Sequence, residues 1–312
     1  MKHVSIVGGG NVGTNTAFFV TENRTAPVTV VDVKEGMTTG KALDLMEAGP
    51  LRGYDTRIRG ADSIEAIQGS DVVLITAGRV RRPGESRVDL YQDNSGTVRA
   101  VCEEIKRLAP EAIVVNLVEP VDLLTRLARA TLGFDRRRVL GIGGILTSTR
   151  LRHLVSRELG VSPREVTAVV IGPHHTSMVF VRDTIRVSGV PVRNLMDEQK
   201  LESLIEQART AGDTILGMAQ QSTAYYGPSA AAATVIEAIC RDTRATLPVS
   251  VVCQGEYGIR DQSIGVLARI GSSGAERILE IRMSEAERQA FDQAAAKLQE
   301  AWDQVNRSAT VG

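Results

Sequence analysis

Residues 4–13, VSIVGGGNVG, decide the fold. They place Gly8, Gly10 and Gly13 in the spacing GxGxxG, between a run of apolar residues and a helix predicted from about Asn11. In such a turn the first glycine permits a tight bend, the second lets the backbone approach a pyrophosphate, and the third lets the helix pack closely. The helix N-terminus favours the same anion. The stretch therefore predicts a dinucleotide-binding βαβ unit.

A carboxylate at the end of the next apolar run, VTVVDV, supports this interpretation. Asp32 lies 24 residues after Gly8. There it can accept hydrogen bonds from both ribose hydroxyls and repel a 2'-phosphate, so NAD is favoured over NADP. The alternative is a sheet of the same kind in which Asp32 is only structural. Small residues in ITAG, at the end of a later run, would also let a dinucleotide lie close to the backbone. The residues expected at the cofactor are Gly8, Gly10, Asn11, Val12, Gly13, Asp32, Thr76, Ala77 and Gly78.

The chain changes character near residue 143. Before it, short apolar runs alternate with helical segments, which is typical of parallel strands covered on both faces. After it come antiparallel-looking runs and long helices from about Asp197 and Ser284. We predict an α/β protein with a Rossmann-type doubly wound parallel sheet in residues 1–143, which binds NAD. Residues 144–312 would form an α+β substrate domain, with a ligand cleft at the junction.

Composition narrows the range of partners. Basic and acidic residues number 37 each, so no basic field favours nucleic acid or an anionic membrane. No apolar stretch approaches the roughly 18 residues of a membrane span, and the N-terminus lacks a signal-peptide pattern, so we expect a cytoplasmic protein. Cys102, Cys240 and Cys253 are widely spaced, which favours reduced thiols over disulfides, and no metal-ligand cluster is apparent. A small-molecule partner is the remaining expectation.

Two groups of residues suggest the chemistry of the cleft. Hydride transfer to a carbonyl needs a proton donor of near-neutral pKa and a cation for a carboxylate. VIGPHHTSMVF, residues 170–180, offers His174 and His175 after an apolar run. A loop beyond ITAG offers four arginines as the cation. The alternative interpretation is that these arginines are only solvated surface charges. These are Arg79, Arg81, Arg82 and Arg87.

From residue 3 to about residue 305 the chain resembles the lactate/malate dehydrogenase family. The stretches that carry the resemblance are GGGNVG, VVDV, GKALDL, DVVLITAG, RRPGESRVDL, PVDLLT, VLGIGGILTSTRLR, GPHHTSMV and STAYYGPSAAAATVIEAI. Within the family the chain is most similar to the lactate-dehydrogenase-like malate dehydrogenases. The resemblance implies an NAD-dependent enzyme that forms a homodimer or homotetramer.

The resemblance also implies roles for individual residues. His174 would carry the proton, Arg87 would polarise the substrate carbonyl, and Arg150 would bind the adjacent carboxylate. Arg81 occupies the position where malate dehydrogenases hold an arginine for the distal carboxylate and lactate dehydrogenases usually have glutamine, so malate and oxaloacetate are favoured. A monocarboxylate would leave that buried cation unpaired. Asn94 is implied at the cofactor.

The cleft also departs from the family. His175 and Thr176 follow His174, where the family usually has glycine and then aspartate or asparagine. Thr147 replaces the aspartate that pairs with the histidine, so we expect reduction that is weaker or shifted to lower pH. Glu119 replaces the asparagine before PVD. Our hypothesis is that Glu119 orients His174 in place of the missing aspartate.

Three functions remain open at this point. The first is a malate dehydrogenase with an altered proton relay. The second is a dehydrogenase for another 2-hydroxy acid, since the anion at Glu119 could repel a dicarboxylate. The third is an NAD-binding homologue of low activity with a sensing or structural role. His174 is the predicted catalyst and His175 a neighbouring loop residue; the alternative is that both simply end a strand.

Overall fold

The computed structural model describes residues 1–81, 85–219 and 224–310, of which residues 308–310 are described by their backbone alone. Arg82 and the start of STAYYGP, both named above, lie outside these residues. The helices and strands are, in chain order, β1 (Val4–Val7), α1 (Asn11–Glu22), β2 (Val28–Val31), α2 (Met37–Arg52), β3 (Ile58–Ala61), β4 (Val72–Ile75), α3 (Arg87–Leu108), β5 (Ile113–Asn116), α4 (Val121–Leu132), β6 (Val139–Gly141), α5 (Ile145–Leu159), β7 (Val166–Ile171), β8 (Val179–Val187), β9 (Val190–Pro191), α6 (Glu198–Ala219), α7 (Tyr226–Cys240), β10 (Ala245–Gln254), β11 (Arg260–Gly271), β12 (Gly274–Ile278) and α8 (Glu285–Thr310).

A nine-stranded sheet forms the centre of the molecule, in the order β12-β11-β10-β6-β5-β4-β1-β2-β3. The strands from β3 to β6 run parallel, and Val4 is in register with Val28 on one side and Val72 on the other. The strand order therefore reverses at β1, which pairs with both β2 and β4. Ligands of open α/β sheets bind beyond the carboxyl ends of strands at such a point. The predicted doubly wound sheet is confirmed.

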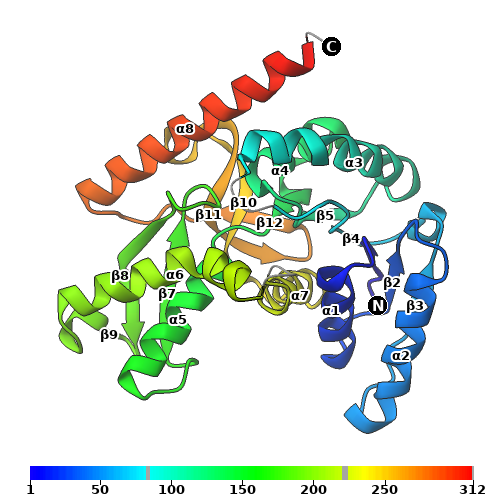
Figure 1. The fold of residues 1–312 in the computed structure, drawn as a ribbon, viewed down its shortest axis with the longest axis horizontal. Coiled ribbons are helices and arrows are strands. Elements are labelled where there is room, and N and C mark those ends of the chain that lie inside the picture. Colours follow the sequence, from blue (N-terminus) through cyan, green and yellow to red (C-terminus); the bar gives the residue numbers. More distant parts are fainter. Residues whose placement is uncertain (82–84, 220–223, 311–312) are drawn as a thin grey trace.

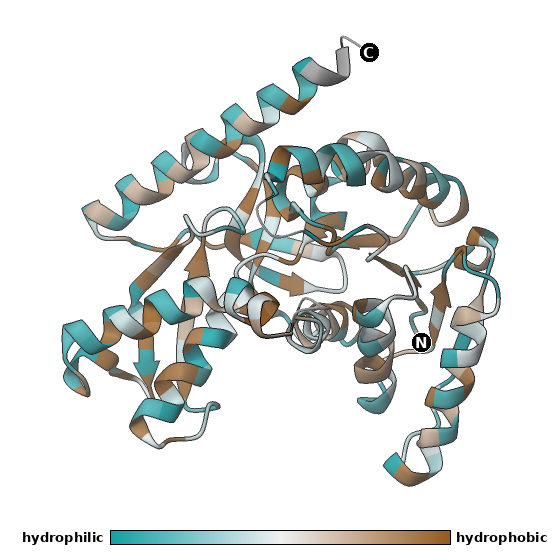
Figure 2. Cartoon of the chain, in the orientation of Figure 1, coloured by the Kyte–Doolittle hydropathy of each residue, from teal (hydrophilic) through white to brown (hydrophobic). Residues whose placement is uncertain are grey.

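Helices cover both faces of this sheet because its strands are apolar on both faces. Successive side chains of a strand point to opposite faces. Val4 and Ile6 accordingly belong to one hydrophobic core with α1 and α7, whereas Val7 belongs to a second core with α3 and α4. Figure 1 shows α3 and α4 on one side of the sheet and α1 and α7 on the other. In Figure 2 the strands are mainly hydrophobic and the outward helix faces hydrophilic.

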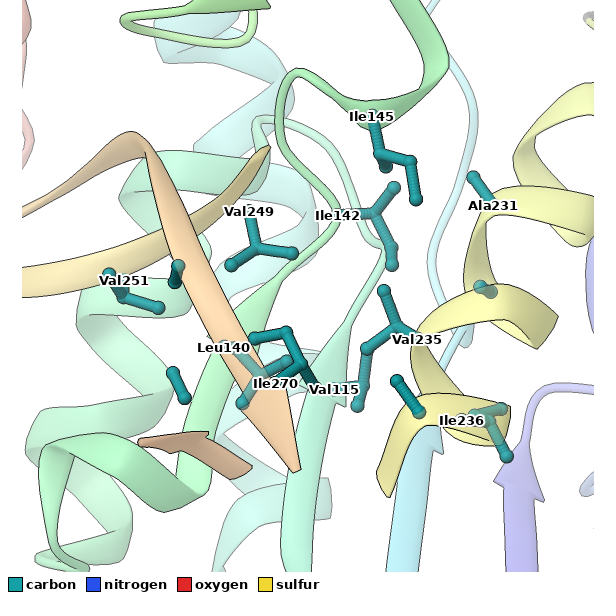
Figure 3. Close-up of a cluster of buried hydrophobic side chains, with 14 of the residues drawn as sticks. Val115, Leu140, Ile142, Ile145, Ala231, Val235, Ile236, Val249, Val251 and Ile270 are labelled. Atoms are coloured by element: carbon teal, nitrogen blue, oxygen red, sulfur yellow. The ribbon is translucent and has the colours of Figure 1, made fainter. Parts of the chain in front are cut away.

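The second half of the chain contributes to two sheets. Strands β7, β8 and β9 form a separate antiparallel sheet that packs against α5 and α6. Strands β10 to β12 instead extend the main sheet in antiparallel fashion, with Val251 of β10 beside Leu140 of β6. Figure 3 shows Leu140 and Val251 in one cluster with Val235 and Ile236 of α7. Burying each such side chain stabilises the fold by roughly 1.5–3 kcal/mol, so the two halves share a continuous core.

Two local features differ from the sequence analysis. We placed Arg87 in a loop, but it is the first residue of α3, because Ser86 caps the helix by accepting a hydrogen bond from the Asp89 amide at 3.1 Å. Strand β3, with the sequence IRGA, was not predicted because it is short and half polar; its pairing with β2 determines it. No helix among the described residues is long and apolar enough to cross a membrane.

Candidate active site

The glycine-rich turn after β1 is shaped by close backbone contacts. Gly8 has a φ of +117°, and a Cβ there would lie 2.5 Å from Thr76 Oγ1. A Cβ on Gly13 would lie 1.9 Å from the Gly8 carbonyl oxygen, so α1 can approach the strand only with glycine at this position. Around Gly10, the residue before α1, a Cβ would meet nothing within 4 Å. The turn thus leaves open space at a helix N-terminus, which fits a pyrophosphate.

Asp32 lies next to this turn. Its Oδ2 accepts a hydrogen bond from the Gly9 amide at 2.7 Å, and its Oδ1 accepts one from the Lys34 amide at 3.0 Å. Each carboxylate oxygen can accept a further bond, as two ribose hydroxyls would require. Lys41 Nζ of α2 donates to the Gly9 carbonyl at 2.7 Å. We did not predict Lys41, although the stretch GKALDL contains it; only the fold brings it to the turn.

The other residues predicted at the cofactor surround the end of β4. Thr76 Oγ1 donates to the Gly8 carbonyl at 2.9 Å, which ties the two strand ends together. A Cβ on Gly78 would lie 2.5 Å from Val118 Cγ1, so its position also needs glycine. The buried amide of Asn94 donates to the carbonyls of Arg79 and Glu119 and accepts from the Arg79 amide. Asn94 therefore holds two loops in place, and its contact with the cofactor stays a prediction.

A pocket of about 260 Å³ lies between the two halves of the chain, beyond the ends of β4 and β5. It brings together most of the residues predicted for the chemistry. The predicted residues that line it are Val12, Thr76, Gly78, Arg79, Arg81, Arg87, Glu119, Thr147, Arg150, His174 and His175. The predicted residues that do not line it are Gly8, Gly10, Asn11, Gly13, Asp32, Ala77 and Asn94. Within the described chain, no group of three or more His, Cys, Asp or Glu side chains could hold a metal ion.

Glu119 lies between the predicted proton carrier and the predicted polarising arginine. Its Oε1 is 3.2 Å from His174 Nε2, and its Oε2 is 3.9 Å from Arg87 Nη1. Burial raises the pKa of Glu119, but the His174 and Arg87 charges, with hydrogen bonds from His174 and the Val121 amide, lower it to about 2. Glu119 is therefore an anion at neutral pH. It contacts both groups that a substrate carbonyl oxygen would need.

The opposite nitrogen of His174 has a different environment. Among the described residues, His174 Nδ1 and Thr147 Oγ1 are both buried and have no hydrogen-bond partner. Thr147 thus does not replace the family's carboxylate as a partner of the imidazole. Because Nδ1 is buried, Nε2 is the nitrogen that can exchange a proton with a molecule in the pocket. Glu119 contacts this same nitrogen.

Asp122 fixes the backbone of the histidine loop. It lies at the start of α4 and is 4% exposed. Its Oδ2 accepts a hydrogen bond from the His174 amide at 2.6 Å, and its Oδ1 accepts one from Ser250 Oγ at 2.5 Å. Arg87 Nη1 donates to the His174 carbonyl at 2.8 Å. No local sequence pattern indicates this role of Asp122, because it lies 52 residues before His174.

His175 behaves differently from His174. Burial lowers the pKa of His175, and the Arg87 charge lowers it further, to about 4. Its Nδ1 is hydrogen-bonded to the hydroxyl of Thr176 at 2.5 Å. A histidine that stays uncharged at neutral pH is a poor proton donor. The environment therefore favours His174 as the proton carrier of the pair.

Arginines dominate the rest of the pocket. Arg81, Arg87, Arg150 and Arg209 line it together with two carboxylates, Glu119 and Asp213. Arg79 also lines the pocket, but it pairs with Glu85 and Asp93 outside the pocket, and Arg209 likewise pairs with Glu206. The other three arginines exceed the two carboxylates by one charge. Burial lowers the pKa of Arg150, and the Asp213 charge opposes this effect. The excess of positive charge in the pocket is complementary to a carboxylate ligand.

Known proteins share this architecture over nearly the whole chain. Residues 2–141 match the family model for the lactate/malate dehydrogenase NAD binding domain, and residues 145–308 match the one for the alpha/beta C-terminal domain. A malate dehydrogenase of Chloroherpeton thalassium is 38% identical over 304 residues, which cover 97% of this chain and 98% of that protein.

Solved structures agree with these matches. The malate dehydrogenase of Salinibacter ruber is 35% identical, with a TM-score of 0.94 and 99% of each chain covered. The lactate dehydrogenase of Cryptosporidium parvum, solved with lactic acid and nicotinamide adenine dinucleotide, is 29% identical, with a TM-score of 0.94 and 98% of each chain covered.

Proposed function

The chain belongs to the lactate/malate dehydrogenase family and is an NAD-dependent 2-hydroxy acid dehydrogenase, and we propose that it interconverts malate and oxaloacetate through an altered proton relay. The observation that carries the proposal is the pocket itself. It combines His174, an anionic partner at Nε2 and an excess of positive charge.

The cofactor site supports this reaction. The open turn at Gly10 would hold the pyrophosphate of NAD, and Asp32 would accept hydrogen bonds from the adenosine ribose. When bound, the reduced cofactor would supply the hydride for reduction and the oxidised cofactor would accept it in oxidation. Asn11 and Val12, at the first turn of α1, would face the same phosphates.

The arginines distinguish the substrate. Arg150 would bind the carboxylate next to the reacting carbon in a bidentate pair, and Arg81 would bind the distal carboxylate. Pyruvate lacks the distal carboxylate and would make no ion pair with Arg81, so it would lose a charge-assisted contact that oxaloacetate makes. Replacing Arg81 with glutamine tests this assignment. We expect the ratio of kcat/KM for oxaloacetate over pyruvate to fall at least about tenfold; an unchanged ratio would remove Arg81 from the site.

His174 and Arg87 would act on the substrate oxygen. In reduction, protonated His174 donates its Nε2 proton to the oxygen while Arg87 stabilises the developing negative charge. In oxidation, neutral His174 accepts the hydroxyl proton. Glu119 is a positioning residue in this relay, because its charge stabilises the protonated imidazole from the Nε2 side. Thr147, whose hydroxyl contacts no donor or acceptor among the described residues, supplies no such charge.

One observation favours a second candidate. Because Glu119 contacts both His174 and Arg87, a substrate oxygen must share or displace these contacts. The carboxylates of a dicarboxylate substrate would also approach the negative charge of Glu119. A 2-hydroxy acid other than malate would fit if its substituent next to Glu119 were neutral or a hydrogen-bond donor. Turnover of such an acid, with little turnover of malate, would support this candidate.

The wider setting is part of the proposal. Residues 1–143 would bind NAD and residues 144–312 would supply most of the substrate contacts. A homodimer or homotetramer is supported by the exposed apolar side chains of Leu43, Met46 and Leu51 on α2. A cytoplasmic location is supported by cysteines that are all free, Cys102, Cys240 and Cys253.

A further inference from the structure

Asp213 is a second carboxylate in the pocket that the mechanism does not use. It lies on α6, and its Oδ1 accepts a hydrogen bond from Arg81 Nη2. Arg81 is the arginine assigned to the distal carboxylate of the substrate. The guanidinium is therefore already paired with a carboxylate of the same chain.

The neighbours of Asp213 place it among the other substrate arginines. A Cβ on Gly212, the preceding residue, would lie 3.7 and 3.8 Å from the two terminal nitrogens of Arg150. Arg209, one helical turn earlier, also lines the pocket. The negative charge of Asp213 opposes the effect of burial on the pKa values of Arg87 and Arg150. Asp213 thus acts on Arg87 and Arg150 as well as on Arg81.

We propose that Asp213 is a specificity-determining residue, whose carboxylate binds Arg81 in the place of the substrate's distal carboxylate and competes with it. This inference rests on the proposed function, since it assumes that Arg81 binds a dicarboxylate. The Asp213 side chain is 57% exposed and can turn towards solvent when a substrate displaces it.

The pairing has opposite consequences for two classes of substrate. A dicarboxylate must break the pair, so Asp213 weakens its binding. A monocarboxylate leaves the pair intact, so Arg81 keeps a counter-charge and the penalty for an unpaired cation is reduced. Asp213 therefore narrows the preference for oxaloacetate over pyruvate. A half-exposed ion pair of this kind corresponds to an effect of about two- to fivefold.

The test is Asp213→Asn, which keeps the size of the side chain and removes its charge. We expect the KM for oxaloacetate to fall about two- to fivefold and kcat to change less than about twofold, while the KM for pyruvate does not fall. Asp213→Glu, which restores the charge, should return the oxaloacetate KM towards that of the parent enzyme. The control is Glu202→Gln, which removes another α6 carboxylate that pairs with an arginine, Arg182, outside the pocket.

A double variant separates the two assumptions. With Arg81→Gln already present, Asp213→Asn should leave the KM for oxaloacetate unchanged, because the guanidinium for which Asp213 and the substrate compete is absent. If Arg81→Gln alone leaves the oxaloacetate to pyruvate ratio unchanged, the proposed function loses its specificity arginine and this inference falls with it. Suppose instead that Arg81→Gln lowers the ratio of kcat/KM for oxaloacetate over pyruvate. The role of Asp213 alone is then overturned if Asp213→Asn leaves the KM for oxaloacetate unchanged. It is also overturned if Asp213→Asn raises KM and lowers kcat for both substrates.

Discussion

Replacing Glu119 with glutamine removes one charge next to His174 Nε2 and keeps the size of the side chain. At 3.2 Å, the two charges attract with about 5 kcal/mol in a medium of effective dielectric constant about 20. The Glu119 side chain is 37% exposed, so water screens the pair and we expect about 1–2 kcal/mol to remain. That energy corresponds to a displacement of about one pH unit in a proton-dependent step.

The assay is kcat/KM for oxaloacetate reduction and for malate oxidation, each from about pH 5 to 9. Reduction needs the protonated imidazole, which Glu119 stabilises. In Glu119→Gln the fall of reduction with rising pH should therefore begin about one pH unit lower, and malate oxidation should persist to correspondingly lower pH. The KM for oxaloacetate should not rise, because a like charge leaves the pocket.

The control is Glu256→Gln. The hydrogen bonds from Arg136 lower the pKa of Glu256 to about 2, but this pair lies outside the pocket. Its loss should leave both pH profiles in place. If the profiles and rates of Glu119→Gln match those of the parent enzyme, Glu119 has no part in the relay and our reasoning about the pair is wrong.

Further predictions concern the other side of the imidazole, the neighbouring histidine and the glycine turn. Thr147→Asp, combined with Glu119→Asn, should restore a carboxylate for the buried His174 Nδ1. Reduction by this double variant should therefore persist to higher pH than reduction by Glu119→Asn alone. Equal pH profiles of the two variants would contradict this. His175 has a pKa of about 4 in the folded chain, below its ordinary value of 6.5. Between these two values the unfolded chain binds more protons than the folded chain, so the free energy of unfolding decreases as pH falls. His175→Gln should therefore lose less stability between about pH 6.5 and 4, measured by urea unfolding; a slope equal to the parent's would refute it. Gly13→Ala should weaken NAD binding at least about tenfold in a fluorescence titration, because its Cβ would lie 1.9 Å from the Gly8 carbonyl oxygen; unchanged affinity would refute the close approach.

Local patterns were sufficient to predict the glycine-rich turn and the parallel sheet. The spacing of the sequence motif identifies Gly8, Gly13 and Asp32. The structure explains the two glycines, because close contacts exclude a Cβ at both positions. The parallel strands other than β3 were predicted because each is a continuous apolar run. Strand β3 lacks such a run and depends on its neighbour β2, so no local pattern could indicate it.

The site was harder to predict where it depends on distant contacts. The hypothesis that Glu119 meets His174 came from two substitutions at neighbouring strand ends, and the structure places the two side chains in contact. It does so at Nε2, however, and leaves Nδ1 without a partner among the described residues, which no sequence pattern indicated. Asp122 and Asp213 reach the pocket from α4 and α6, and only tertiary packing shows their partners.

The most direct test of the account is NADH oxidation by the purified protein with oxaloacetate, beside pyruvate and a control without substrate, from about pH 5 to 9. We expect turnover with oxaloacetate well above that with pyruvate, and a rate of reduction that falls as pH rises, because reduction consumes a proton. NADH binding without turnover of oxaloacetate at any of these pH values would contradict it, and would favour another 2-hydroxy acid or a homologue that binds NAD without catalysis.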